Sequence, residues 1–371
     1  MRSPAPPYGI DASRSFGSRR TGTEQYATAL TRELIALAPG HCRLYFRRPP
    51  TEPPPPGAVL RILPAPRLWT HLRLGPELAL RPPGLVFIPA HVMPLVCRPP
   101  AVVTVHDLGY EHLPWAHPWR SRAYLRWSTA RHVRLAARLV ADSEATRMDL
   151  IQRYGAEPDK VRPVLLAPGP GLAPPDPAAR AEARAALGLP PATPYLLHVG
   201  TLQPRKNLPR LLEAFSLLAS AWPELRLVLA GMPGWGRENL AGRMARLGIA
   251  DRVLVPGFME PHLMAGLYGE ALALVMPSLY EGFGLPVVEA MACGVPVVCS
   301  RTSSLPEAAG GAALLVDPSD SSDIAAAVAR LLQSPELRAD LVARGLRRAA
   351  ELSWRSSARQ VLEVFEEVLG E

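Results

Sequence analysis

The chain has 371 residues, 48% of them hydrophobic, which is enough for about two domains with full cores. No apolar run reaches the ~20 residues of a membrane-spanning helix, and the first ten residues lack the apolar segment of a signal peptide, so we expect a cytoplasmic protein. The net charge of +8 suits an anionic partner, but only two of the 41 basic residues are lysines, so much of the charge reflects a preference for arginine. The four cysteines have neither zinc-ligand nor disulfide-framework spacing, and neither is expected.

Strands alternate with helices in both halves of the chain, a pattern typical of parallel α/β sheets. In the first half, strands are predicted at YGIDAS, LVFIPA, AVVTVHD and RLVADS, with helices over residues 24–37 and 119–134. Residues 167–194 are rich in Pro, Ala and Gly and predict a domain boundary. In the second half, apolar runs that end in Gly, Ser or Asp predict strands at YLLHVG, RLVLAG, RVLVPGF, ALALVMPS, VPVVCS and AALLVDP.

The predicted organisation is an N-terminal domain (1–175), a linker (176–193), a C-terminal domain (194–353) and a terminal helix (354–371). Within the first domain, residues 119–138 combine Trp127 with six arginines: Arg120, Arg122, Arg126, Arg131, Arg134 and Arg138. On a helical wheel these arginines fall on two opposed faces, which favours a solvated basic helix over a membrane-binding one. Peripheral membrane contact is kept as the alternative.

Residues 278–289, SLYEGFGLPVVE, carry the clearest functional signal in the sequence. A buried strand precedes them, Gly282 and Gly284 allow a tight turn, and Pro286 suits the start of a helix. Such a strand-turn-helix unit directs backbone N–H groups at an anion, which predicts a phosphate site. Glu281 and Glu289 would bracket this phosphate and accept hydrogen bonds from hydroxyl groups, as a nucleotide sugar requires.

A second cluster of charge follows the predicted strand at residues 195–199. Gly200 ends this strand, and a turn presents Arg205 and Lys206 ahead of a helix that Asn207 could cap. Two cations at the start of a helix suit a diphosphate. They could equally be solvent-facing charges, but a lysine is rare in this chain, which favours a specific role for Lys206.

The string YEGFGLPVVEAMACGVPVVCS resembles the Glu-x7-Glu signature of retaining glycosyltransferase family 4, and HVGTLQPRKN and VVTVHDLGY resemble two further segments of that family. The resemblance implies a GT-B fold, with two Rossmann-like domains whose parallel sheets face each other across a cleft. It implies that a hexose, with mannose favoured, is moved from a nucleotide-diphosphate sugar to a saccharide or lipid-linked acceptor with retention of configuration. A GMPGWG segment containing Trp235 resembles members that use guanine-linked mannose.

The residues and the resemblance together predict the site. Catalytic roles fall to His106, Arg205, Lys206 and Glu281, and donor binding to Gly22, Gly200, Thr201, Gly257, Phe258, Gly282, Phe283, Gly284, Leu285 and Glu289. His106 is expected to orient the sugar, whereas Asp107 is expected to be structural. The sequence departs from the family twice: Thr201 stands where many members have arginine, and Thr21-Gly22-Thr23 replaces a glycine-rich turn.

Neither a metal nor a cofactor is expected, because the two cations and the helix start would absorb the charge of the leaving diphosphate. The alternatives are a non-catalytic nucleotide-sugar-binding protein, a phosphorylase or epimerase on the same plan, and a nucleic-acid-binding protein. We expect no nucleic acid partner, since the Arg-Trp stretch is the only support for one. The family also implies that the amphipathic helix over residues 354–369 crosses to the first domain, although it could pack on the second.

Overall fold

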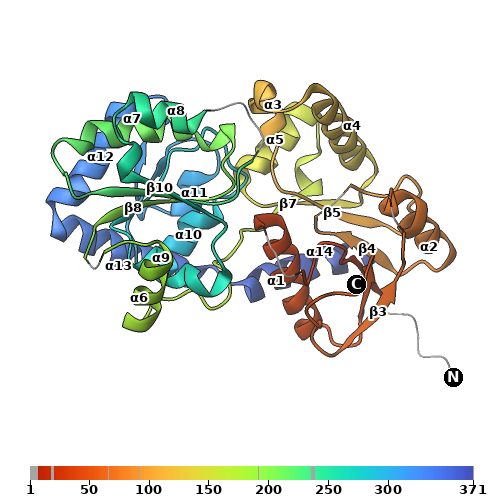
Figure 1. The fold of residues 1–371 in the computed structure, drawn as a ribbon. Coiled ribbons are helices and arrows are strands. Elements are labelled where there is room, and N and C mark those ends of the chain that lie inside the picture. Colours follow the sequence, from red (N-terminus) through yellow and green to blue (C-terminus); the bar gives the residue numbers. More distant parts are fainter. Residues whose placement is uncertain are drawn as a thin grey trace. The chain divides into compact units, whose positions relative to one another are not determined.

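The computed structural model describes residues 7–17, 21–65, 67–90, 92–190, 192–234 and 239–370. The chain divides into two compact units (Figure 1). Unit 1 comprises Met1–Glu111, His117–Leu166 and Ser353–Glu371, and unit 2 comprises His112–Ala116 and Ala167–Leu352.

Unit 1 contains a parallel sheet in the order β3-β2-β1-β4-β5-β6-β7. Its strands are β1 (Tyr8–Asp11), β2 (Cys42–Phe46), β3 (Ala58–Ile62), β4 (Leu85–Ile88), β5 (Ala101–Val105), β6 (Arg138–Ala141) and β7 (Val161–Pro163). The sequence predicted β1, β4, β5 and β6 and missed the other three. β3 and β7 form the two edges, where partial exposure weakens the apolar pattern that marks a buried strand.

The helices around this sheet include one from the end of the chain. They are α1 (Gly22–Leu37), α2 (Gly75–Leu80), α3 (Gly109–His112), α4 (Trp119–Leu135), α5 (Glu144–Tyr154) and α14 (Trp354–Leu369), with short turns η1 (Thr70–Leu74) and η3 (Pro158–Lys160). The turn η2 (Pro114–Ala116), which follows α3, belongs to unit 2. α14 packs on α1, β4 and β6. Phe365 is fully buried between Tyr8 and Phe87, with ring centroids 5.2 and 5.3 Å away.

Unit 2 contains a second parallel sheet, in the order β10-β9-β8-β11-β12-β13. Its strands coincide with the six apolar runs predicted in this half: β8 (Tyr195–Val199), β9 (Arg226–Ala230), β10 (Val253–Gly257), β11 (Ala273–Met276), β12 (Val297–Ser300) and β13 (Ala313–Val316). In the central strands both faces are covered, and the resulting continuous apolar runs made the prediction straightforward.

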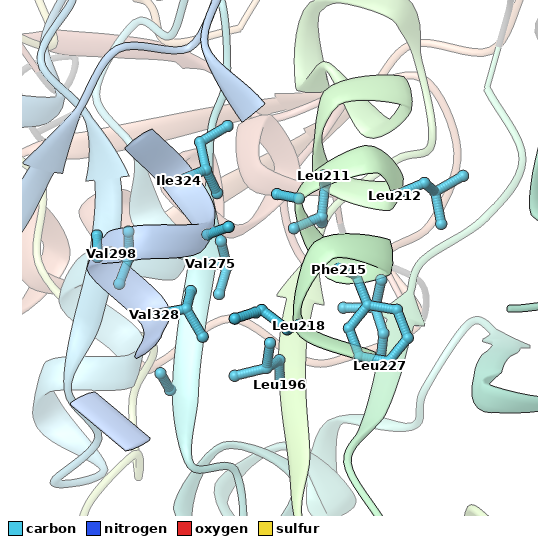
Figure 2. Packing of buried hydrophobic residues seen from close by; sticks show 14 of the residues in the cluster. Leu196, Leu211, Leu212, Phe215, Leu218, Leu227, Val275, Val298, Ile324 and Val328 are labelled. Carbon is cyan, nitrogen blue, oxygen red and sulfur yellow. The ribbon is translucent and has the colours of Figure 1, made fainter. Parts of the chain in front are cut away.

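The helices of unit 2 are α6 (Pro177–Ala186), α7 (Leu208–Ala219), α8 (Leu240–Arg246), α9 (Met264–Gly269), α10 (Leu285–Ala292), α11 (Leu305–Ala309), α12 (Ser321–Gln333) and α13 (Pro335–Glu351). Short turns are η4 (Pro204–Lys206), η5 (Ala250–Arg252) and η6 (Pro261–Leu263). Helices α7 and α12 pack together on one face of the sheet, where Phe215 and Val328 join Leu196 and Val275 in a buried cluster (Figure 2). This core supports the strands whose ends carry the site.

The residues predicted to form a linker, 176–193, lie within unit 2 and include α6. Helix α6 packs on α9, and the contact is close at Gly266, where an added Cβ would lie 2.1 Å from the Ala179 carbonyl oxygen. A Cβ on Gly269 would likewise lie 2.3 Å from Cγ of Pro175. Residues 176–193 are therefore a packed part of unit 2 and not a linker between the units.

The position of Phe365 generates a test of how unit 1 is held together. We expect Phe365→Ala to destabilise the protein by about 3–5 kcal/mol, because a fully buried aromatic ring is replaced by a cavity. Glu363→Ala, on the exposed side of the same helix, is the matched control and should change stability by less than about 0.5 kcal/mol. Chemical denaturation measures both variants, and equal stabilities would contradict the role of α14 in the core.

Candidate functional site

Most of the predicted donor residues follow β8 or β11, where the strand order of unit 2 reverses. β8 and β11 lie side by side but lead to opposite halves of the sheet, and open α/β sheets bind their ligands at such a switch point. Lys206 follows β8, and Glu281 follows β11. The two segments are hydrogen-bonded to each other, since the Leu279 N–H donates to the Arg205 carbonyl oxygen at 2.8 Å.

Glu281 is the electrostatic centre of this site. The Lys206 ammonium donates to its Oε1 at 2.7 Å, and Arg205 Nη1 donates to its Oε2 and, at 3.2 Å, to the Tyr280 carbonyl oxygen. Glu281 and Lys206 are each only 4% exposed, so both charges depend on one another for compensation. Burial alone would raise the pKa of Glu281, but Arg205 and Lys206 outweigh burial and lower it to about 2.

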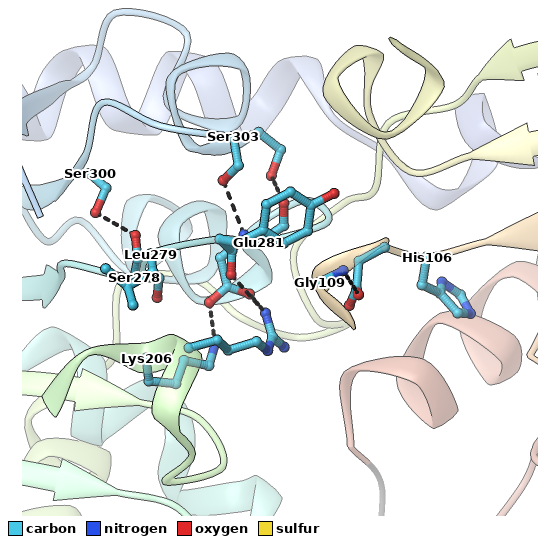
Figure 3. Close-up of polar contacts among 12 residues, drawn as sticks. His106, Gly109, Lys206, Ser278, Leu279, Glu281, Ser300 and Ser303 are labelled. Atoms are coloured by element: carbon cyan, nitrogen blue, oxygen red, sulfur yellow. Dashed lines mark hydrogen bonds and ion pairs between the residues drawn. The ribbon is translucent and has the colours of Figure 1, made fainter. Parts of the chain in front are cut away.

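The loop that carries Glu281 is held by hydroxyl groups from the segment after β12. The Glu281 N–H donates to Ser303 Oγ at 3.0 Å, and Ser304 Oγ donates to the Glu281 carbonyl oxygen at 2.9 Å. Ser300 Oγ donates to the Ser278 carbonyl oxygen at 2.7 Å (Figure 3). Sequence reasoning missed these serines, because nothing local to residues 300–304 indicates which backbone they meet.

Gly200 provides the space for the Lys206 side chain. A Cβ at residue 200 would lie 3.0 Å from Cε and 3.2 Å from Nζ of Lys206, and the φ of +143° is one that other residues rarely adopt. Thr201, next in the chain, is half-buried, and Gly257 and Phe258 lie at and just beyond the end of β10. The Gly257 carbonyl oxygen accepts from the Gly231 N–H at 2.8 Å, so its turn is tied to the end of β9.

The start of α10 follows Glu281 directly. Gly284 precedes the helix with a φ of +105°, and a Cβ there would lie 2.6 Å from Leu305 Cδ2, so only glycine fits. No side chain caps this helix, and Pro286 lies in its first turn. Gly282 and Phe283 are buried, and Leu285 opens the helix. The helix start thus presents backbone amides and a positive dipole end beside the two cations.

Glu289 lies on α10 and is 7% exposed. The Tyr268 hydroxyl donates to its Oε2 at 2.8 Å, and Tyr268 is fully buried. This partner comes from α9, 21 residues earlier in the chain, and sequence reasoning missed it because an isolated tyrosine in an apolar helix gives no functional signal. Tyr268 therefore restricts the orientation of the Glu289 carboxylate.

One prediction about this region is wrong. Asn207 precedes α7 but makes no side-chain cap; its Nδ2 donates instead to the carbonyl oxygens of Pro277, at 3.0 Å, and Pro318, at 2.6 Å. Its left-handed backbone, with a φ of 58°, turns the side chain toward the neighbouring strand ends. Asn207 thus joins the segments after β8, β11 and β13. Trp235 lies outside the described residues.

Unit 1 carries the other predicted residues, Gly22 and His106. His106 follows β5, and its Nδ1 lies 2.7 Å from Oδ2 of Asp142, which follows the adjacent strand β6. The Tyr26 ring meets the imidazole edge-on at a centroid distance of 4.9 Å. Gly22 begins α1, one turn before Tyr26, and is exposed. Asp107 accepts from the Gly109 N–H at 2.8 Å and so stabilises the turn into α3.

The His106–Asp142 pair is buried enough to shift both pKa values. Burial alone would lower the pKa of His106, but the Asp142 carboxylate outweighs burial and raises it. Burial raises the pKa of Asp142, only partly offset by His106. The pair therefore holds a proton on Nδ1 that points to Asp142. Asp142 was not predicted, although its position directly after a strand, next to the one that carries His106, is a signal that could have found it.

Within the described ranges, no three or more His, Cys, Asp or Glu side chains form a group that could hold a metal ion. Arg205, Lys206 and the start of α10 could bind an anion, and the carboxylates of Glu281 and Glu289 could accept hydrogen bonds from hydroxyl groups. Such groups suit a phosphorylated sugar.

Comparison with known proteins identifies the family. Residues 20–166 match the family described as Glycosyltransferase Family 4, and residues 179–348 match Glycosyl transferases group 1. The chain is 34% identical over 266 residues to O-antigen chain mannosyltransferase B of Escherichia coli, a match that covers 71% of this chain and 70% of that protein. It is 37% identical to D-inositol 3-phosphate glycosyltransferase of Acidothermus cellulolyticus, over 64% of this chain and 55% of that protein.

Solved structures share the fold at low identity. Sucrose-phosphate synthase from Thermosynechococcus elongatus superposes with a TM-score of 0.78 at 23% identity, covering 98% of this chain and 99% of that one. Anabaena HepE, solved with UDP-glucose, superposes with a TM-score of 0.74 at 18% identity, over 97% and 99% of the two chains. Both units are Rossmann-like, as in these neighbours, so the fold is GT-B. The chain belongs to glycosyltransferase family 4 and is a glycosyltransferase.

Proposed function

We propose that this glycosyltransferase moves a mannose from GDP-mannose to a saccharide or lipid-linked acceptor, with retention of configuration and without a metal ion. The observation that carries the proposal is the pairing of Arg205 and Lys206 with Glu281 beside the uncapped start of α10. These groups supply positive charge where a diphosphate would lie. They need no reorganisation when the charge develops.

In the proposed reaction, the bond between the anomeric carbon and the diphosphate oxygen breaks, and the acceptor oxygen bonds to the same face of that carbon. The leaving phosphate oxygen takes the proton of the acceptor hydroxyl. Arg205, Lys206 and the amides of Gly284 and Leu285 stabilise the charge left on the diphosphate. Glu281 holds the two cations in position and accepts from the sugar, for which a carboxylate has enough lone pairs.

The choice of mannose rests on the similarity to O-antigen chain mannosyltransferase B. Other relatives are named for a different acceptor, such as the D-inositol 3-phosphate glycosyltransferases. A screen of nucleotide sugars, read as hydrolysis by purified protein and repeated with excess chelator, tests donor and metal together. Faster hydrolysis of a uracil-linked sugar than of GDP-mannose would contradict the proposed donor. Loss of activity with chelator that magnesium restores would contradict the metal-independent mechanism.

We also propose that the enzyme is cytoplasmic and works at the inner face of a membrane. Its cysteines, Cys42, Cys97, Cys293 and Cys299, are free thiols, as is usual in a reducing compartment. A lipid-linked acceptor would bring the enzyme to the membrane surface.

The first prediction about the reaction concerns Lys206. Lys206→Met keeps the apolar stem of the side chain but removes the charge, and we expect kcat to fall about 10²- to 10³-fold, as when one donor to a developing oxyanion is lost. Arg347→Met, which removes an exposed cation elsewhere in unit 2, is the control. In this variant Arg205 is the one remaining cation of the pair on the buried Glu281 carboxylate, so the protein could be less stable. Thermal unfolding therefore has to show that the variant is folded at the assay temperature. Near-normal turnover would contradict the assignment.

The second prediction concerns the ribose of the donor, which we assign to Glu289. Glu289→Gln should weaken GDP binding more than Glu281→Gln does, and Tyr268→Phe should weaken it about fivefold, because one hydrogen bond that orients Glu289 is lost. Titration calorimetry with free GDP measures all three variants. Equal losses for the two glutamate variants would show that the roles of Glu281 and Glu289 are not separated in this way.

The third prediction concerns the orientation of His106, for which we propose Asp142 as a positioning residue. The carboxylate fixes the proton on Nδ1, which leaves Nε2 as the ring nitrogen that can meet a sugar hydroxyl. Because the folded-state pKa of His106 is raised, the pair stabilises the fold below the unfolded pKa of about 6.5, and this contribution is lost as pH rises through the folded pKa. Asp142→Asn removes the charge, so burial should then lower the pKa of His106.

An NMR titration of the histidines, with His106→Gln to assign the signal, measures this shift. Because Nε2 can accept from a sugar hydroxyl only when the imidazole is neutral, we also expect the acidic limit of the pH profile of kcat/KM to move to lower pH in Asp142→Asn. An unchanged His106 pKa in the variant would rule out the proposed influence of Asp142.

A further inference from the structure

Residues 112–116 belong to unit 2, although the chain on both sides of them belongs to unit 1. They comprise the last residue of α3 and the turn η2. The chain passes from unit 1 to unit 2 at a single peptide bond, between Glu111 and His112. A short segment from the first half of the chain is therefore part of the unit that carries Glu281.

The backbone on the unit 1 side of this bond is firmly held. Glu111 has two partners: the Tyr154 hydroxyl donates to its Oε1 at 2.6 Å, and Arg126 Nε lies 3.0 Å from the same oxygen. At the start of α3, Asp107 accepts from the Gly109 N–H. Contacts at both ends of this short helix thus leave its last residue little freedom.

On the unit 2 side, the ring of His112 stacks on the ring of Tyr280. The two ring centroids are 4.3 Å apart, and the ring planes are inclined by 21°. Tyr280 is only 4% exposed, whereas His112 is exposed. Stacked aromatic pairs stabilise one another beyond the area that they bury. The imidazole of His112 therefore restrains the Tyr280 ring.

Tyr280 is joined directly to the charged residues of the donor site. Its carbonyl oxygen accepts from Arg205 Nη1 at 3.2 Å, and the N–H of the same peptide group, which belongs to Glu281, donates to Ser303 Oγ at 3.0 Å. Because a peptide group is planar, a shift of Tyr280 would move both hydrogen-bonding groups together. It would also move the carboxylate that pairs with Arg205 and Lys206.

We propose that His112 is a positioning residue of the glycosyltransferase reaction. Through the Tyr280 ring it keeps the peptide group between Tyr280 and Glu281, and with it Arg205, in the orientation that the leaving diphosphate requires. This inference rests on the proposed roles of Arg205 and Glu281. It assigns a stacked ring to position 112, and no proton transfer.

A positioning role differs from a merely structural one in its kinetic effect. Arg205 is proposed to stabilise charge that develops as the bond to the diphosphate breaks, so a displaced Arg205 should lower kcat more than it changes KM. A contact that only stabilises the fold would change the unfolding temperature and leave kcat unchanged in a folded protein.

Hydrolysis of GDP-mannose, or of the nucleotide sugar that the screen shows to be hydrolysed fastest, tests the proposal with the whole chain. His112→Ala should lower kcat by up to about tenfold, the upper value for one aromatic pair, and change KM less. His112→Phe should restore turnover, because it keeps a stacked ring. Trp115→Ala is the matched control, since Trp115 lies in the same segment and is 65% exposed, and it should match the wild type.

A double-mutant cycle tests whether His112 acts through Tyr280. In a Tyr280→Leu background, His112→Ala should cause no further loss of kcat, because the ring that it restrains is already absent. A loss that persists in this background would overturn the proposal by showing that His112 acts on the donor directly. Wild-type kcat in His112→Ala would overturn it as well, and so would a His112→Phe variant that is as slow as His112→Ala.

Lys206→Met in the same assay separates this inference from the proposed function. If Lys206→Met loses turnover while His112→Ala does not, the role of His112 alone is wrong. If Lys206→Met keeps near-normal turnover, the assignment of the donor site is wrong, and the role of His112 is wrong with it. Thermal unfolding of each variant identifies the temperature range in which all of them are folded, and the rates are compared there.

Discussion

The structure of unit 2 depends on the compensation of one buried carboxylate by two cations. Taking Glu281 out of water costs several kcal/mol, and the cost is offset only if Lys206 and Arg205 hold close, well-directed contacts. Several otherwise unrelated features serve this requirement. Gly200 leaves space for the lysine, Ser303 and Ser304 hold the backbone of Glu281, and a backbone hydrogen bond joins the two loops. Without ligand, the carboxylate keeps both cations in the place where a diphosphate would need them.

A comparable pairing occurs in unit 1. His106 and Asp142 follow adjacent parallel strands, and each lies within hydrogen-bond distance of the other. In both units, a charged pair is thus assembled from residues that follow different strands. Parallel sheets favour this, because the carboxyl ends of all strands lie at one edge. Partners separated by 36 residues, as for His106 and Asp142, or by 75, as for Lys206 and Glu281, become neighbours without any local signal between them.

The two units differ in how many charged side chains they carry and in where these lie. Unit 2 has nearly balanced charge, and two of its cations, Lys206 and the part-buried Arg205, pair with the buried Glu281. Unit 1 carries a surplus that lies on exposed side chains, next to tryptophan, tyrosine and leucine. Arginine therefore occurs both beside a buried carboxylate, as Arg205, and on the exposed surface of unit 1.

The sequence by itself determined the α/β class, the strands of unit 2 and the segments that follow β8 and β11. These features have local causes: continuous apolar runs mark strands buried on both faces, and glycine and proline mark the turns that follow them. It also predicted Glu281 and Lys206, because charged residues at such strand ends lie on one edge of a sheet, whereas the role of His106 was implied by the resemblance to the family. Only the tertiary structure decided that Glu281 contacts both cations, that Tyr268 orients Glu289 and that Asp142 faces His106. It also decided that Asn207 bonds to distant carbonyl groups and that Trp119 and Trp127 of α4 are exposed. Each of these outcomes depends on which segments pack together, and packing brings together residues whose separation in the chain carries no pattern.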